Sequence, residues 1–101
     1  MSNPLTAGLA PTHPGELLRE IVLPALPVSK TEVARLLGLS RQHLHDILAE
    51  RKPVTPRTAL RLAKLLGGSP ESWLRMQMAF DLRCETAAMA DELERIAPLA
   101  A

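Results

Sequence analysis

Residues 40–46, Ser-Arg-Gln-His-Leu-His-Asp, concentrate hydrogen-bonding side chains within two helical turns. The guanidinium of Arg41 can donate two hydrogen bonds to one guanine, and the amide of Gln42 can pair in both directions with one adenine. Leu44, Ile47 and Leu48 recur at the spacing of one helix face, so the polar residues lie on the other faces. The pattern predicts a helix that contacts base edges. The candidate base contacts are Ser40, Arg41, Gln42, His43 and His45.

Residues 32–48 are predicted to form two short helices rather than one, because Gly38 and Ser40 interrupt them. Glycine adopts the left-handed conformation that ends many helices, and serine caps the helix that follows. We expect helices over 30–37 and 41–49. Two helices joined in this way form a helix-turn-helix, whose second helix enters the major groove. The residues expected to face the core are Val33, Leu36 and Leu37 in the first helix and Leu44, Ile47 and Leu48 in the second.

Cationic and hydroxyl side chains flank this pair of helices. Ser29 can cap the backbone N–H of Glu32 while the Glu32 carboxylate reaches back, which is a capping box. A helix N-terminus that begins here also binds anions favourably. Contacts with DNA phosphates position a protein without reading sequence, and they weaken steeply with salt. The expected phosphate contacts are Ser29, Lys30, Thr31, Arg51, Lys52 and Thr55.

Proline and capping residues predict three further helices. The first spans about 12–26, where Pro14 is tolerated in the opening turn, His13 is a helix-start residue and Pro24 stops the helix. Thr55 and Pro56 open a fourth helix, which Gly67 and Gly68 end, and Ser69 and Pro70 open a longer fifth helix over about 71–96. The expected inward residues are Leu17, Leu18, Ile21 and Val22 in the first helix and Ala59, Leu60, Leu62, Ala63 and Leu66 in the fourth.

No strand pattern is present, so the sequence predicts an all-α fold, a compact five-helix bundle in which helices 2 and 3 form the helix-turn-helix. The expected division of the chain is a flexible N-terminal arm over 1–11, a DNA-binding core over 12–68, a C-terminal helix over 69–97 and a tail over 98–101.

The predicted fifth helix carries two apolar stripes. The remaining core is too small to cover both, so we expect one stripe to pack within the subunit and the other against a second copy. A two-fold dimer would present two recognition helices about one DNA turn (~34 Å) apart. The first stripe is Trp73, Met76, Phe80, Cys84 and Ala87, with Trp73 expected in the core and Cys84 buried or half-buried. The second stripe is Leu74, Met78, Leu82, Met89, Leu93 and Ile96. The predicted dimer interface is Met78, Leu82, Met89 and Leu93.

The composition excludes several classes of protein. Apolar residues make up 47% of the 101 residues, enough for one modest core, and a single cysteine excludes an internal disulfide. No apolar run approaches the ~20 residues of a membrane span, and the N-terminus has no signal-peptide pattern. We therefore expect a cytoplasmic protein, associated with the nucleoid when bound to DNA. No metal-ligand spacing, phosphate loop or nucleophile–base set stands out, so we expect no enzyme, metal, cofactor or small-molecule substrate.

The charge is unevenly distributed along the chain. Residues 29–64 contain eight Lys and Arg against three acids, whereas residues 65–101 contain six acids against three Arg. A basic middle and an acidic tail indicate two surfaces for two kinds of partner.

The segment SKTEVARLLGLSRQHLHDILAERK resembles the helix-turn-helix of phage Cro/cI-type repressors, the XRE family. The flanking segments HPGELLREIVL and RTALRLAKLLGGSPESWLRMQMAFDL are similar to those of HigA-type antitoxins, and the resemblance covers about residues 12–83. It implies a lambda-repressor-like fold, a homodimer, a RelE-like HigB ribonuclease toxin as partner and repression of the shared operon through a palindromic operator. Ser40, Arg41, Gln42 and His45 fall on the family's base-reading positions. Ala49-Glu50 departs from the Asn-Gly that relatives often have.

Two alternatives remain open from the sequence. The chain can serve mainly to sequester a basic toxin through its acidic tail, or it can be a stand-alone repressor without a toxin. The role of Asp46 is also open, since its carboxylate can pair with Arg41 or Lys30 or accept a hydrogen bond from a cytosine amine.

Overall fold

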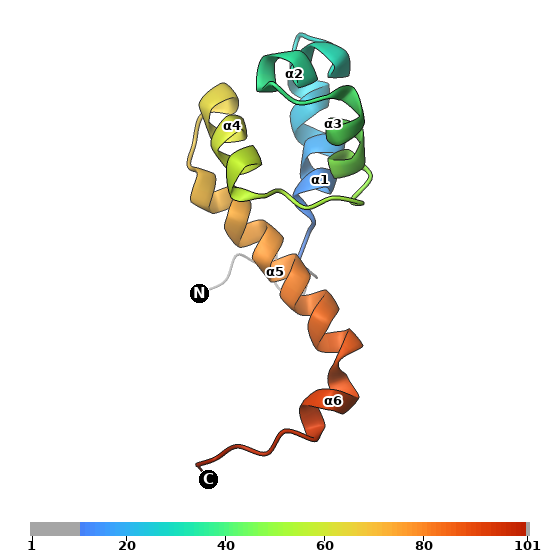
Figure 1. Ribbon diagram of the computed structural model, residues 1–101. Coiled ribbons are helices and arrows are strands. Elements are labelled where there is room, and N and C mark those ends of the chain that lie inside the picture. Colours follow the sequence, from blue (N-terminus) through green and yellow to red (C-terminus); the bar gives the residue numbers. More distant parts are fainter. Residues whose placement is uncertain (1–10, 101) are drawn as a thin grey trace.

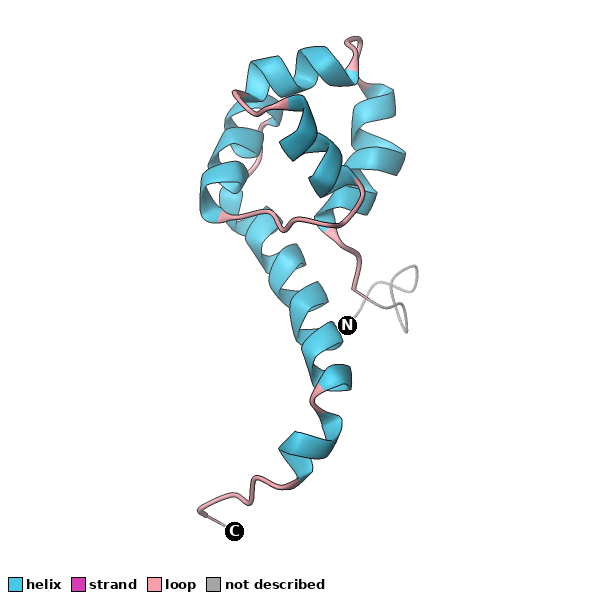
Figure 2. Ribbon diagram, turned by 45° about the vertical axis from the view of Figure 1, so that its right-hand side comes forward, coloured by secondary structure: helices cyan, strands magenta, loops and turns pink. Residues whose placement is uncertain are grey.

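The computed structural model describes residues 11–100, and these residues contain six α-helices and no strand. The all-α prediction is confirmed. The helices α1 (Pro14–Leu17), α2 (Lys30–Leu37), α3 (Arg41–Leu48) and α4 (Pro56–Leu66) form a head, and α5 (Pro70–Ala88) leads away from it to α6 (Ala90–Glu94) (Figure 1). Figure 2 shows the same separation from a second side. The predicted arm over 1–11 lies outside the described residues except for Pro11, and so does the last residue of the predicted tail.

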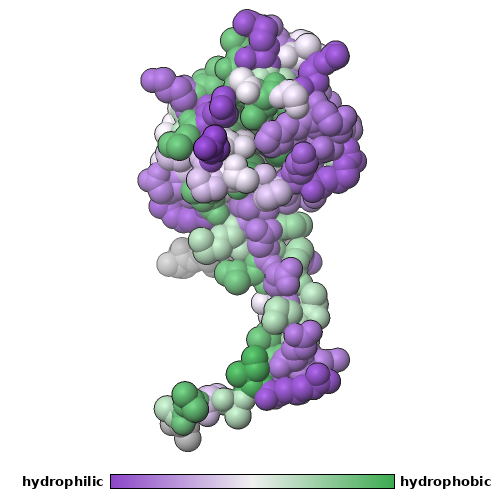
Figure 3. All heavy atoms as spheres, in the orientation of Figure 1, coloured by the Kyte–Doolittle hydropathy of each residue, from purple (hydrophilic) through white to green (hydrophobic). Residues whose placement is uncertain are grey.

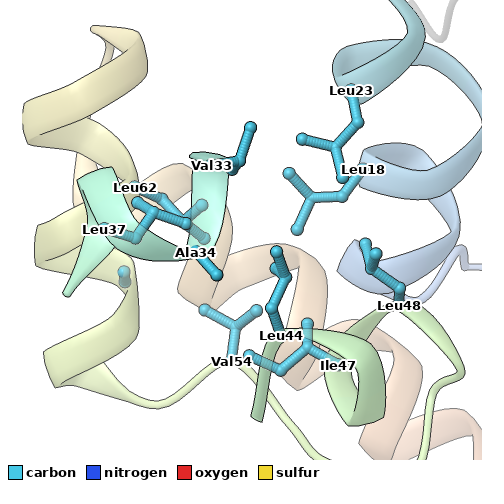
Figure 4. Close-up of a cluster of buried hydrophobic side chains, with 11 residues drawn as sticks. Leu18, Leu23, Val33, Ala34, Leu37, Leu44, Ile47, Leu48, Val54 and Leu62 are labelled. Atoms are coloured by element: carbon cyan, nitrogen blue, oxygen red, sulfur yellow. The ribbon is translucent and has the colours of Figure 1, made fainter. Parts of the chain in front are cut away.

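One apolar core lies inside the head. Its side chains come from the first helical segment, α2, α3, the loop before α4 and α4 itself, and they point toward a common centre (Figure 4). Full burial of one Val, Leu or Ile side chain contributes about 1.5–3 kcal/mol to stability. The head therefore folds around this cluster. The buried apolar residues are Leu18, Leu23, Val33, Ala34, Leu37, Leu44, Ile47, Leu48, Val54, Ala59 and Leu62.

The predicted hydroxyl caps are present at the starts of α2, α3, α4 and α5. The Oγ of Ser29 accepts from the N–H of Glu32 at 3.1 Å and the Oγ of Ser40 from that of His43 at 3.0 Å. Thr55 and Ser69 cap α4 and α5 in the same way. Each cap is worth about 1 kcal/mol. The capping box at α2 is incomplete, because the carboxylate of Glu32 pairs with Arg35 instead of reaching back.

The first helical segment differs from the regular helix that the sequence predicted. After α1 the chain widens into a π-helical turn, η1 (Leu18–Val22), and then tightens into a 3₁₀ turn, η2 (Leu23–Ala25). Pro24 excludes a regular continuation because it has no N–H and its ring would crowd the carbonyl of Glu20. The wide turn shifts the inward face by one residue, so Leu23 is buried whereas Ile21, predicted inward, is 63% exposed.

Three further predictions about the helices were wrong. Leu36 and Leu60 were expected inward but are 45% and 60% exposed, because α2 turns Ala34 into the core and α4 turns Thr58 and Ala59 inward. The last predicted helix is two helices, since the chain breaks at Met89.

Candidate nucleic-acid interface

Gly38 makes the turn between α2 and α3. Its φ of +72° lies in the left-handed region, as the sequence predicted, and the next N–H, that of Leu39, donates to the carbonyl of Ala34 at 2.9 Å. A Cβ at this position would also overlap the guanidinium of Arg61, which donates to the carbonyl of Leu37 at 2.9 Å. The left-handed backbone conformation therefore favours glycine here, and the end of the flexible Arg61 side chain would have to shift to admit a Cβ.

Most of the predicted base contacts are exposed at the start of α3. Ser40, Arg41, Gln42 and His45 are exposed, whereas His43 is half-buried at the flank of the helix. The buried face of α3, opposite them, is formed by Leu44, Ile47 and Leu48.

Arg41 and His45 share one side of α3, since they lie four residues apart. With Lys30 and Thr31 of α2 they line a hollow of about 190 Å³, whose floor is Leu44 and Leu48. Two predicted base contacts and two predicted phosphate contacts are thus brought together between the two helices.

Gln42 and Asp46 share the outer side of α3. The Nε2 of Gln42 donates to Oδ1 of Asp46 at 2.9 Å. Arg51 donates to the same oxygen from two nitrogens, at 2.9 and 3.2 Å, and the Nζ of Lys52 lies 3.7 Å from Oδ2. The hydrogen bond from Arg51 is the main cause that lowers the pKa of the Asp46 carboxyl. Asp46 therefore pairs with the cations that follow α3, and neither Arg41 nor Lys30 is its partner.

The predicted phosphate contacts form two groups at the two edges of α3. Ser29, Lys30 and Thr31 are exposed at the start of α2. The others, Arg51, Lys52 and Thr55, lie on the loop between α3 and α4 and are also exposed.

Three residues that support this surface were missed by the sequence reading. Arg19 donates to the carbonyl of Leu48 at 2.6 Å and so covers the C-terminal end of α3, as Arg61 does for α2. The buried side chain of Gln77 accepts from the N–H of Val54 at 2.8 Å and ties the loop after α3 to α5. These contacts join residues 23 to 29 positions apart, and no local pattern signals them.

Most of the second apolar stripe stays uncovered within the subunit, although Leu74 packs against the core. Met78, Leu82 and Leu93 are 58%, 60% and 43% exposed, and Met89 is half-buried. Apolar side chains are visible along this part of the molecule in Figure 3, and Met78 and Leu82 border a hollow of about 400 Å³ beside Val54 and Leu74. The first stripe packs on the head through Trp73 and Phe80. Cys84, expected buried or half-buried, is exposed.

Residues 11–100 match neither the pattern of a metal site nor that of a membrane-spanning helix. No three His, Cys, Asp or Glu side chains of this part cluster as metal ligands would. None of its helices combines the length and the apolar character that a bilayer crossing demands.

The chain is similar to a known family, to other bacterial proteins and to solved structures. The helix-turn-helix family matches residues 18–74. Virulence-associated protein I of Dichelobacter nodosus is 42% identical over 71 residues, which are 70% of this chain and 66% of that protein. Among solved structures, antitoxin GraA is 40% identical with a TM-score of 0.83, over 91% of this chain and all of GraA. Pseudomonas aeruginosa antitoxin HigA with the higBA promoter is 31% identical with a TM-score of 0.82, over 88% and 98%.

These relatives are named as antitoxins or a virulence-associated protein, and none is named as an enzyme. The family match covers more than half of the chain, and the solved antitoxins share its fold over nearly their whole length. The chain therefore belongs to the XRE-type helix-turn-helix family and, within it, to the HigA-like antitoxins.

Proposed function

We propose that this chain binds the DNA upstream of its own gene through α3 and represses transcription from it. The observation that carries the proposal is the exposure of Arg41, Gln42 and His45 on a helix whose opposite face is anchored in the core. Arg and Gln recognise guanine and adenine edges in the major groove. The solved Pseudomonas antitoxin is described with its promoter DNA, which supports the same use of the fold here.

The protein acts as a dimer in this proposal. The stripe of Met78, Leu82, Met89 and Leu93 runs along α5 and α6, outside the head, and exposed apolar surface of this extent is typical of a protein interface. A two-fold dimer would present two copies of α3 to DNA, so the operator should be palindromic with half-sites one helical turn, ~34 Å, apart.

A second partner is a RelE-like ribonuclease toxin. A protein that binds RNA presents cationic surface, and the C-terminal region offers exposed carboxylates to it. Asp91, Glu92 and Glu94 all lie exposed on α6, far from α3 (Figure 1). Repression of transcription through DNA binding and neutralisation of a toxin can therefore use separate surfaces of one molecule.

Binding to a labelled duplex from the upstream region tests the first part of the proposal. We expect this duplex to bind at least 10³-fold more tightly than a shuffled duplex of equal composition at the same salt concentration. Equal affinity for the two would refute the repressor function. Co-expression with the product of a neighbouring small basic reading frame tests whether this chain binds a toxin. The absence of such a reading frame would favour a stand-alone repressor.

A further inference from the structure

Asp46 is the most connected polar residue on the exposed side of α3. Its side chain is only 13% exposed, and Oδ1 accepts from Gln42 and from two nitrogens of Arg51. Its backbone carbonyl accepts from the N–H groups of Arg51 and Lys52 at 2.8 and 3.2 Å. One aspartate thus connects a predicted base contact with two predicted phosphate contacts.

The bond to Asp46 fixes the direction of the Gln42 amide. A carboxylate only accepts hydrogen bonds, so Nε2 must point toward Asp46 and the carbonyl oxygen must point away from it. The amide then presents one acceptor and one remaining N–H. In the major groove this pair matches the N6 donor and N7 acceptor of adenine, whereas guanine presents two acceptors. The orientation of Gln42 is therefore set before any DNA arrives.

The same carboxylate neutralises the loop that follows α3. The side chains of Arg51 and Lys52 are 57% and 54% exposed, but both pair with Asp46, so a phosphate must compete with a carboxylate already in place. This competition acts on every DNA sequence alike, because phosphates carry no sequence information. A negative charge at this position thus weakens binding to all DNA, specific and non-specific alike.

We propose that Asp46 determines sequence specificity without contacting a base, an inference that rests on the proposed DNA-binding function. It orients the amide of Gln42 for one base pair, and it lowers affinity for all DNA alike by holding Arg51 and Lys52. Asp46 is in this sense a positioning residue, and its loss makes the protein bind DNA more tightly and less selectively.

The test compares wild type, Asp46→Asn, Gln42→Ala and the double variant on the upstream duplex and on shuffled DNA, over a range of salt concentrations. Asn has the shape of Asp but no charge, and its amide allows Gln42 both orientations. For Asp46→Asn we expect shuffled DNA to bind about ten-fold more tightly and the salt slope to steepen by about one unit. The ratio of specific to non-specific affinity should fall by about ten-fold.

The double variant separates the two effects. In the Gln42→Ala background, Asp46→Asn should still tighten binding to shuffled DNA but should no longer change the preference among single base-pair variants of the duplex. If it still changes that preference, Asp46 contacts a base itself and the proposal is wrong. An unchanged affinity ratio in Asp46→Asn, with normal operator binding by wild type, overturns this inference alone. A wild type that does not prefer its upstream DNA overturns the proposed function and the inference together.

Discussion

Gly15 lies directly against the carbonyl oxygen of Ile47, so close that a Cβ at this position would overlap that oxygen. The N–H of Gly15 donates to Nδ1 of His13 at 2.8 Å, which caps the start of α1. Because Gly15 has no side chain, α1 can approach the end of α3 closely.

We predict that Gly15→Ala destabilises the protein by about 2–3 kcal/mol, because the backbone of α1 or α3 must move to admit a methyl group. Urea unfolding followed by circular dichroism measures the loss. The control is Glu16→Ala, an exposed neighbour, which should change the free energy of unfolding by no more than about 0.5 kcal/mol. Equal effects of the two variants would show that the close approach is not a constraint.

Glu50 is the only non-glycine residue among 11–100 with a positive φ, +63°. It stands where relatives often have glycine, and a side chain in this conformation costs about 1 kcal/mol. We predict that Glu50→Gly is more stable than Glu50→Ala by about 1 kcal/mol, since both lose the pairing with Arg19 and only glycine removes the strain. Ala49→Gly is the matched control. Its φ is −85°, so glycine there should lower stability. If the Glu50→Gly protein is no more stable than the Glu50→Ala protein, the backbone at this position is not strained.

His13 should give the protein a pH-dependent stability. Burial lowers the pKa of its imidazole, and its neutral Nδ1 accepts the hydrogen bond from Gly15. A group whose pKa is lower in the folded state contributes its full stability above the unfolded pKa of about 6.5. This stability is lost as the pH falls from the unfolded pKa through the lower pKa of the folded state, because in that range only the unfolded chain binds the proton.

The variant His13→Asn keeps a capping side chain but does not titrate. The difference in unfolding free energy between wild type and His13→Asn should therefore shift against wild type as the pH falls below 6.5. A difference that stays constant between pH 7.5 and pH 5 would mean that His13 does not titrate with folding.

The helix starts could be predicted from the sequence because each depends on neighbouring residues. Ser29, Ser40 and Ser69 cap the helices that the hydroxyl and proline spacing indicated. Gly38 ended α2 for the same local reason. These local features were enough to predict the helix-turn-helix and the exposed side of α3.

The errors arose where packing or distant contacts decide. Leu36 follows the leucine pattern of a core face, yet it is 45% exposed because α2 turns the smaller Ala34 into the core. The widened turn at Leu18–Val22 broke the 3.6-residue period on which the first stripe was predicted. The long-range hydrogen bond from Val54 to Gln77 leaves no trace in the local sequence, because its partners lie 23 residues apart.

If the protein dimerises through α5, a charge placed on the exposed apolar stripe of α5 should weaken the dimer, whereas a charge placed on α4 should not. Leu82→Asp should weaken the dimer at least about 100-fold, because the interface would bury an unpaired carboxylate. Leu60→Asp is a close control, since this leucine is equally exposed, at 60%, but lies on α4. Sedimentation equilibrium at several concentrations measures both. A dimer that survives Leu82→Asp but dissociates in Leu60→Asp would place the interface on α4 instead.

The central claim is that side chains following Ser40 read DNA bases. The most direct measurement is the affinity of Arg41→Ala for the upstream duplex and for shuffled DNA at one salt concentration, beside Lys30→Ala. Arg41→Ala should lose about 1–3 kcal/mol on the upstream duplex and much less on shuffled DNA. Lys30→Ala should weaken both duplexes alike. If Arg41→Ala keeps the full preference of wild type for the upstream duplex, α3 does not read bases through Arg41 and the account is contradicted.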